Sequence, residues 1–178
     1  ESASRTTKVK ATQGKTAKAK NLTLRTVAKG TITATVKGLK KGDKVYAYNT
    51  KSKETVRLTT ARKSGTVKLK RKISPGAYRV VIGGQNIGSK VVTVKTNKTS
   101  RSVTLEAAKA RTAVWGTIKT PDGEALAGAD VLVLDRYGTK AGDAVSGSNG
   151  RYSITGVVNG KYTARATDPS GTYASTQA

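Results

Sequence analysis

No stretch of this 178-residue sequence places apolar residues at helical spacing for more than a turn or two. Short runs in which apolar and polar residues alternate lie instead between glycine-rich turns, as in residues 66–71 (Thr-Val-Lys-Leu-Lys-Arg). A period of two places alternate side chains on opposite faces of a strand, and β-branched residues pack well there. The pattern therefore predicts an all-β fold.

The residue types that are missing restrict the chemistry. The sequence contains neither Cys nor His, which excludes disulfide frameworks, thiolate sites, catalytic triads and histidine-bound metals. Asp122, Asp130, Asp135 and Asp143 lack the spacing of a calcium loop and are typical of turns. We therefore expect no catalytic residue, no metal site and no cofactor, and a protein that binds or assembles rather than an enzyme.

Positive charge is concentrated in the first part of the chain. Residues 1–110 contain 27 Lys and Arg against 4 Asp and Glu, whereas residues 111–178 contain 7 against 6. This asymmetry indicates that the first part binds a polyanion such as an acidic polysaccharide, teichoic acid or extracellular DNA. Alternatively, the lysines are solvent-facing strand residues that prevent aggregation. The candidate polyanion-binding residues are Lys8, Lys10, Lys15, Lys18, Lys20, Lys68, Lys70, Arg71 and Lys72.

The sequence repeats one pattern twice. Residues 30–32 (Gly-Thr-Ile) recur at 116–118, and residues 42–48 resemble 128–134, both at an offset of 86. Gly65 matches Gly150 at an offset of 85, and residues 76–78 match 160–162 at 84. These anchors predict a basic module at 26–108 and a nearly neutral module at 109–178, preceded by an N-terminal arm at 1–25.

The second module carries motifs of a known family. It contains Gly-Thr-Ile at 116–118, Pro-Asp-Gly at 121–123 with Gly-Ala-Asp-Val at 128–131, Asn-Gly-Arg-Tyr at 149–152 and Asn-Gly-Lys-Tyr at 159–162. In these motifs it resembles the carboxypeptidase regulatory-like domain, which is related to transthyretin and to the Cna-B repeats of bacterial pilins and adhesins. The resemblance implies two tandem Ig-like or transthyretin-like β-sandwich modules. It also implies a stalk or spacer role in a secreted bacterial protein.

The second module lacks a counterpart to the end of the first. Residues 90–96 and 102–105 are predicted to close the first sandwich, but the corresponding residues 168–178 are short and polar. An open sandwich exposes apolar core and unpaired backbone groups. The arm follows the order of the closing segments, so we expect it to donate the strand that the second module of another chain lacks. The apolar residues predicted to insert are Val9, Ala11, Leu22 and Leu24.

Head-to-tail strand donation generates an open fibre, so the predicted function is an extracellular, cell-surface structural subunit that polymerises with itself. Three alternatives stay open. The arm is a tether or folds onto its own chain; the sequence is a piece of a longer tandem array; or the chain is a polyanion- or glycan-binding accessory module of a larger secreted protein. The sequence contains no apolar run of membrane-spanning length.

Overall fold

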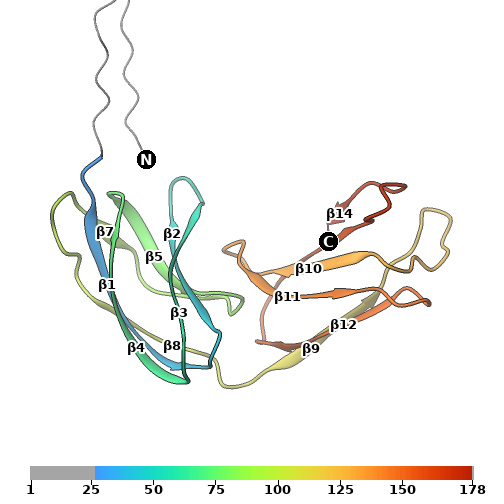
Figure 1. Ribbon diagram of the computed structural model, residues 1–178, viewed down its shortest axis with the longest axis horizontal. Helices are drawn as coiled ribbons and strands as arrows, with labels where there is room; N and C mark the ends of the chain where they lie inside the picture. The colour runs from blue at the N-terminus through green and yellow to red at the C-terminus, as the bar shows by residue number, and fades with distance from the viewer. Residues whose placement is uncertain (1–26, 178) are drawn as a thin grey trace, which may run out of the picture.

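The computed structural model describes residues 27–177. The arm therefore lies outside the described residues, and with it the predicted strand donors Val9, Ala11, Leu22 and Leu24 and the basic residues Lys8, Lys10, Lys15, Lys18 and Lys20. Within 27–177 the chain forms fourteen strands and no helix, and thus no helix able to cross a membrane (Figure 1). The predicted all-β fold is confirmed.

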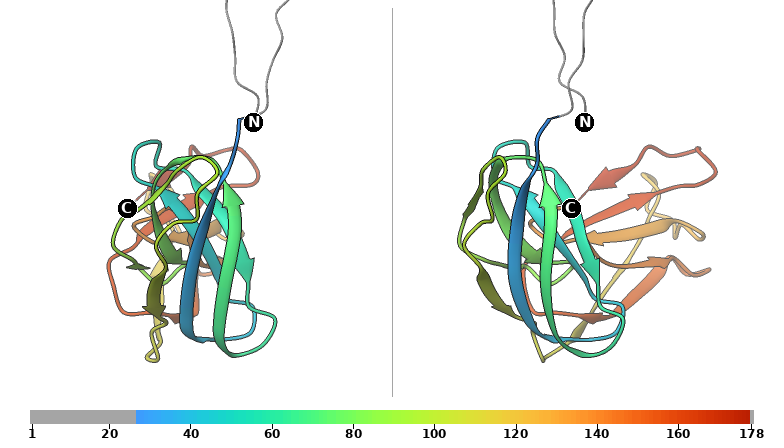
Figure 2. Two further views of the ribbon diagram at one scale, coloured as in Figure 1. Left: turned by 90° about the vertical axis from the view of Figure 1, so that its left-hand side faces the viewer. Right: turned by 60° about the vertical axis from the view of Figure 1, so that its left-hand side comes forward.

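The first eight strands form two facing sheets (Figure 2). One sheet has the order β4-β1-β8, in which β4 is antiparallel and β8 parallel to β1. The other has the order β3-β2-β5-β6, with β7 also paired to β5. The strands are β1 (Gly30–Leu39), β2 (Lys44–Asn49), β3 (Thr55–Thr60), β4 (Gly65–Ile73), β5 (Gly76–Ile82), β6 (Ile87–Gly88), β7 (Val92–Val94) and β8 (Val103–Glu106).

Alternation along β1 and its neighbours builds the core of this first sandwich. Ile32, Ala34 and Val36 are buried, and the threonines between them are half-buried on the outer face. Fifteen buried residues form one cluster, to which β8 contributes Leu105. The period-two pattern of the sequence thus directs one side of each strand inward.

The remaining six strands form a second, smaller sandwich, drawn from yellow to red in Figure 1. Its sheets have the orders β11-β10-β13-β14 and β12-β9. Its core contains four buried residues, with half-buried side chains around them: Val131, Val133, Ile154 and Val157. The strands are β9 (Thr112–Thr117), β10 (Asp130–Leu134), β11 (Lys140–Val145), β12 (Arg151–Val157), β13 (Thr163–Thr167) and β14 (Thr176–Gln177).

Strand register shows which parts of the two sandwiches correspond. Val45 on β2 pairs with Ile82 on β5, and Val131 on β10 pairs with Ala166 on β13, so the predicted offsets of 86 and 84 hold there. The match of Gly30 to Gly116 is wrong. Gly30 begins β1, whereas Gly116 lies near the end of β9.

Pairing with β4 and β12 gives the correct correspondence for the first strands. Val36 pairs with Val67 on β4, and Gly116 pairs with Tyr152 on β12. Tyr152 is the equivalent of Val67 in the second sandwich. Gly116 therefore corresponds to Val36, at an offset of 80. The longer connection from β9 to β10, which contains the Pro-Asp-Gly segment, accounts for the change of offset. A three-residue motif could not reveal this insertion.

Candidate functional site

The two sandwiches differ at the strand that opens each of them. β1 pairs on one edge with β4 and on the other with β8, whereas β9 pairs with β12 on one edge only among residues 27–177. Val36 accordingly has both Val67 and Leu105 as strand neighbours, whereas its equivalent Gly116 has only Tyr152 within the described part of the chain. The second edge of β9, which we call the acceptor edge, is the candidate site.

The backbone groups on the acceptor edge follow from strand geometry. The Ile118 N–H donates to the Gly150 carbonyl of the β12 side at 2.8 Å. Successive residues point their N–H and C=O groups to opposite edges, so those of Trp115 and Thr117 point away from β12. In the first sandwich the residue equivalent to Thr117 is Lys37, whose carbonyl accepts from the Ala107 N–H at 2.9 Å. The acceptor edge therefore presents backbone N–H and C=O groups whose equivalents on β1 are hydrogen-bonded to β8 and the residue after it.

Apolar surface accompanies this edge. Trp115 is 80% exposed and Val145 is 59% exposed. Both line an open cavity of about 680 Å³ that is bordered by β9, β11 and β12. Large apolar side chains rarely gather on the surface of a protein without a partner to cover them. The cavity extends from β9 over β12 toward β11, away from the acceptor edge, so Trp115 is the residue that brings apolar surface next to that edge among residues 27–177.

The interior of the second sandwich is less well covered than that of the first. In the first sandwich Leu105 and Ala107, in and just after β8, are 6% and 3% exposed and belong to the core. In the second, Val114 and Ile118 are only half-buried. The Tyr152 ring lies over Gly116, where an added Cβ would be 2.8 Å from the Tyr152 hydroxyl. A further strand beside β9 would supply the missing apolar cover.

The end of the chain forms a strand that the sequence did not predict. Ala166 on β13 pairs with Thr176 on β14, and the equivalent Ile82 pairs with Ile87 on β6. β14 thus corresponds to β6. Within residues 27–177 no strand of the second sandwich corresponds to β7 or β8.

The predicted basic residues of the first sandwich are exposed on β4. Lys68, Lys70 and Lys72 alternate with inward-pointing residues and lie on one face of the sheet. Arg71 has the opposite orientation and lines a cavity of about 550 Å³. The sequence did not reveal that three further cations border this cavity, because they come from different turns and strands: Lys41, Arg57 and Arg62.

A second feature missed from the sequence is the joint between the sandwiches. The turn between β5 and β6 packs against the second sandwich, where the Gly84 N–H donates to Asp135 Oδ2 at 3.1 Å and to Thr139 Oγ1 at 2.8 Å. The Tyr162 hydroxyl donates to the Gly84 carbonyl at 3.2 Å, and burial raises the pKa of Tyr162. A Cβ on Gly84 would lie 2.6 Å from Ala141 Cα. The joint therefore requires glycine.

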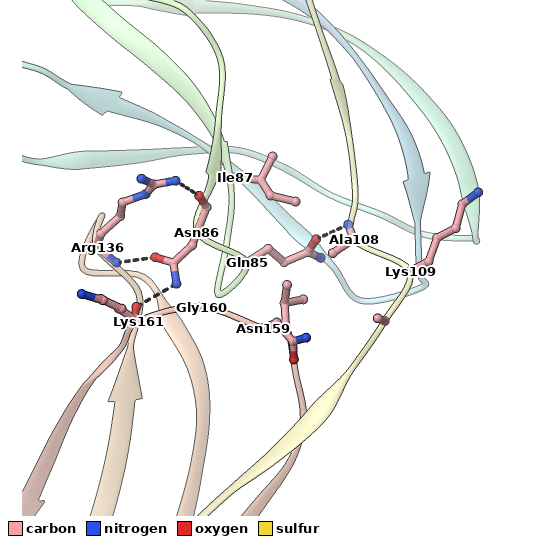
Figure 3. Close-up of a pocket in the computed structure, with 11 residues that line it drawn as sticks. Gln85, Asn86, Ile87, Ala108, Lys109, Arg136, Asn159, Gly160 and Lys161 are labelled. Carbon is pink, nitrogen blue, oxygen red and sulfur yellow. Dashed lines mark hydrogen bonds between the residues drawn. The ribbon is translucent and has the colours of Figure 1, made fainter.

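Asn86 completes the joint (Figure 3). Its Nδ2 donates to the Lys161 carbonyl at 2.9 Å, and its Oδ1 accepts from the Arg136 N–H at 2.8 Å. The Arg136 guanidinium also donates to the Asn86 carbonyl. Gln85 is 1% exposed, and its Oε1 accepts from the Ala108 N–H at 3.0 Å. Polar groups that pair with one another across the joint favour one arrangement of the elements they join.

One family model matches the second sandwich. Residues 113–177 match the family model of the carboxypeptidase regulatory-like domain. The resemblance stated from the motifs is confirmed for this part of the chain. No curated protein matches the chain.

Two solved structures illustrate the more distant similarity. The Bacillus anthracis TIE protein is 20% identical over 79% of this chain, with a TM-score of 0.31, and the chain spans 28% of its length. The shaft pilin SpaA from Lactobacillus rhamnosus GG is 13% identical over 84% of this chain and 92% of its own, with a TM-score of 0.29.

Proposed function

We propose that this chain is an extracellular structural subunit of a bacterial surface fibre, in which the arm of one copy pairs with the acceptor edge of the next. The observation that carries the proposal is the second edge of β9, which has no partner among residues 27–177 although β1 pairs there with β8. On this proposal the chain is a structural protein and not an enzyme.

The pairing of β8 with β1 gives the register of the donated strand. The two strands are parallel, with Ala34 beside Val103 and Val36 beside Leu105. The equivalents of Ala34 and Val36 are Val114 and Gly116, and the arm residues that match the β8 sequence Val-Thr-Leu are 22–24 (Leu-Thr-Leu). Leu22 therefore pairs with Val114 and Leu24 with Gly116 in the proposed fibre.

The side chains of the arm suit the half-buried interior that they would cover. Leu24 corresponds to Leu105, which is 6% exposed, and it lies opposite a glycine. Val9 corresponds to Val94, which is 1% exposed on β7. Burial of a Leu or Val side chain contributes about 1.5–3 kcal/mol. Ala11 completes the apolar set of the β7-like segment.

Donation at one end and acceptance at the other make the contact heterologous, and such contacts extend into open fibres unless the rotation closes a ring. Charge repulsion between the two is weak, because the arm holds seven of the basic residues whereas the second module is nearly neutral. The opposite outcome is a chain that closes its own acceptor edge or receives the strand from a longer polypeptide.

Disulfide trapping tests the register, because the chain has no cysteine of its own. In the proposed pairing Arg25 lies beside Thr117, so chains carrying Arg25→Cys and chains carrying Thr117→Cys should form mixed disulfide dimers on oxidation. Arg151 pairs with Thr117 on the far side, on β12. Arg151→Cys is the matched control, since two strand spacings, about 9.6 Å, exceed the reach of a disulfide.

Electron microscopy and size-exclusion chromatography test the assembly itself. The full chain should form fibres, and a chain without residues 1–25 should remain monomeric. Discrete monomers of the full chain at high concentration would refute the proposal.

A polycationic binding surface is a second candidate function, favoured by the lysines on the outer face of β4. Partners of the required chemistry are acidic polysaccharide, teichoic acid and extracellular DNA. Replacement of Lys68, Lys70 and Lys72 by Ser should lower the salt concentration that elutes the protein from heparin, because fewer counterions are released. Elution at an unchanged salt concentration would contradict it. This function is compatible with a fibre.

A further inference from the structure

The first sandwich has an open cavity of about 550 Å³ between the edge strands of its two sheets. In the described part of the chain, β3 is the edge of one sheet and β4 the edge of the other, and the β3–β4 turn joins them. Four cations from two strands and two turns border this cavity, which we call the arginine cavity: Lys41, Arg57, Arg62 and Arg71.

The arginines of the first sandwich gather at this cavity. Residues 27–110 contain five arginines and fifteen lysines. Three of those arginines border the cavity, but only one of the lysines does. Solubility alone requires no such sorting, because the two side chains carry the same charge. Arginine differs in its planar guanidinium group, which binds two oxygens of a phosphate or carboxylate at once. The sorting therefore indicates a site for an oxyanion.

The four cations are not neutralised by acids within residues 27–177. No carboxylate lines the cavity, and neither of the ion pairs in this part of the chain involves one of the four. Asp43, close by in the β1–β2 turn, already accepts the Lys40 N–H at 2.9 Å and lies 3.7 Å from the Arg111 guanidinium. Like charges around one depression create a positive potential that attracts an anion.

Backbone contacts fix the frame from which the cations project. The Gly42 N–H donates to the Ala61 carbonyl at 2.8 Å, and the Lys41 N–H donates to Ser64 Oγ at 3.2 Å. These bonds join the β1–β2 turn to the β3–β4 turn. Leu58 and Ala61, which also line the cavity, are 4% and 2% exposed. A frame that is ordered before the ligand arrives lowers the entropic cost of binding.

Protection of the edge strands explains only part of this arrangement. Arg71 occupies an inward-directed position on β4, between the half-buried Leu69 and the buried Ile73, and such a charge hinders pairing with another sheet. Lys41 and Arg62 lie in turns, where they protect no strand edge. Their position at the same cavity as Arg71 favours a binding role.

We infer that the arginine cavity binds adjacent phosphate groups of a flexible phosphodiester chain, which is the chemistry of a teichoic acid. The inference rests on the second candidate function, the polycationic surface, and names its site and ligand class. It does not depend on the fibre. The cavity faces the side of β4 opposite Lys68, Lys70 and Lys72, so the two basic regions can be tested separately.

The lining of the cavity favours this ligand over other polyanions. Duplex DNA has a persistence length of about 50 nm and is too stiff to enter a concave surface. Single-stranded nucleic acid is held by aromatic side chains on which its bases stack, and none of the described residues that border the cavity is aromatic. An acidic polysaccharide carries its charges on bulky rings, which limits how many of them turn toward one cavity. A chain of phosphates and short polyols requires only oxyanion donors.

Calorimetric titration of the full chain with an oligomer of glycerol phosphate tests the inference. The double variant Arg62→Gln, Arg71→Gln should bind the oligomer at least about tenfold more weakly, because it loses charge-assisted hydrogen bonds to phosphate. The matched control is Lys63→Gln, Lys70→Gln, which removes the same charge from the same turn and strand but outside the cavity. It should weaken binding by less than about threefold. All four side chains are exposed, so both variants should keep the circular dichroism spectrum of the native chain.

A charge-conserving variant separates the guanidinium groups from charge alone. Arg62→Lys, Arg71→Lys should also bind the oligomer more weakly, but with the salt dependence of the native chain, because the number of neutralised phosphates is unchanged.

Three results would overturn the inference. The first is equal weakening by the arginine and lysine pairs, which would leave a diffuse polycationic surface standing. The second is tighter binding of single-stranded DNA or a heparin oligosaccharide of equal charge, with the same dependence on Arg62 and Arg71, which would refute the ligand class. The third is no binding of the oligomer by the native chain. The heparin test of Lys68, Lys70 and Lys72 then shows whether the polycationic function fails as well.

Discussion

Replacement of Gly84 by Ala tests whether the module joint is a built contact. Gly84 has a φ of +70°, and an added Cβ would lie 2.6 Å from both Ala141 Cα and the Lys140 carbonyl oxygen. Gly128 is the matched control, because its φ is +76° and nothing lies within 4 Å of an added Cβ. Both substitutions impose the same backbone strain, but only Gly84→Ala forces the sandwiches apart.

The magnitudes follow from these contacts. A left-handed conformation costs a residue with a Cβ about 1–2 kcal/mol, so Gly128→Ala should lower the free energy of unfolding by that amount. Gly84→Ala carries the same cost and also disrupts the two hydrogen bonds from the Gly84 N–H to Asp135 and Thr139. Loss of these buried bonds adds about 2–4 kcal/mol.

Urea unfolding followed by circular dichroism measures the difference between the two variants. Small-angle X-ray scattering then reports whether the sandwiches keep their mutual orientation. We expect the Gly84 variant to be the less stable and to lose that orientation. Equal stability of the two variants, to within about 0.5 kcal/mol, would refute the joint as a stabilising contact.

Three further predictions concern the second sandwich. Ile154→Ala should destabilise it by about 2–4 kcal/mol in chemical denaturation, because Ile154 is 3% exposed within a four-residue core. Trp115→Ser should change the stability of unassembled protein by less than about 0.5 kcal/mol, because the side chain is 80% exposed, yet weaken association in sedimentation experiments. Hydrogen bonds from the Ser170 side chain and the loop backbone lower the pKa of Asp168 from 3.8. Its contribution to loop order should persist above pH 3.8, be lost as the pH falls through the lowered pKa, and be absent in Asp168→Asn, as NMR titration would show.

The sequence predicts the strands well, because burial on one face leaves a visible period of two. The alternation in residues 30–39 corresponds to a strand whose apolar residues are buried. Gly65 begins β4, and its match Gly150 directly precedes β12, so these glycines also mark equivalent strands. The predicted module boundaries and strand donors stay predictions, since the donors lie outside the described residues.

Other features leave no such trace in the sequence. A six-residue insertion between β9 and β10 shifted the true equivalent of Gly116 from Gly30 to Val36, and only the strand pairing reveals it. β14 has just two residues, too few for a periodic pattern. The joint could not be predicted either, because Gly84 and its partners Asp135 and Thr139 lie more than fifty residues apart. Contacts between distant turns depend on the three-dimensional arrangement, which local patterns do not encode.

Amide hydrogen exchange at Trp115 and Thr117 tests the acceptance of a donated strand most directly. The full chain at high concentration should protect both amides from exchange, because each would donate to the incoming strand, and dilution or removal of residues 1–25 should abolish the protection. Fast exchange of both amides in concentrated full-length protein, or protection that is independent of concentration and of the arm, would contradict strand donation between chains.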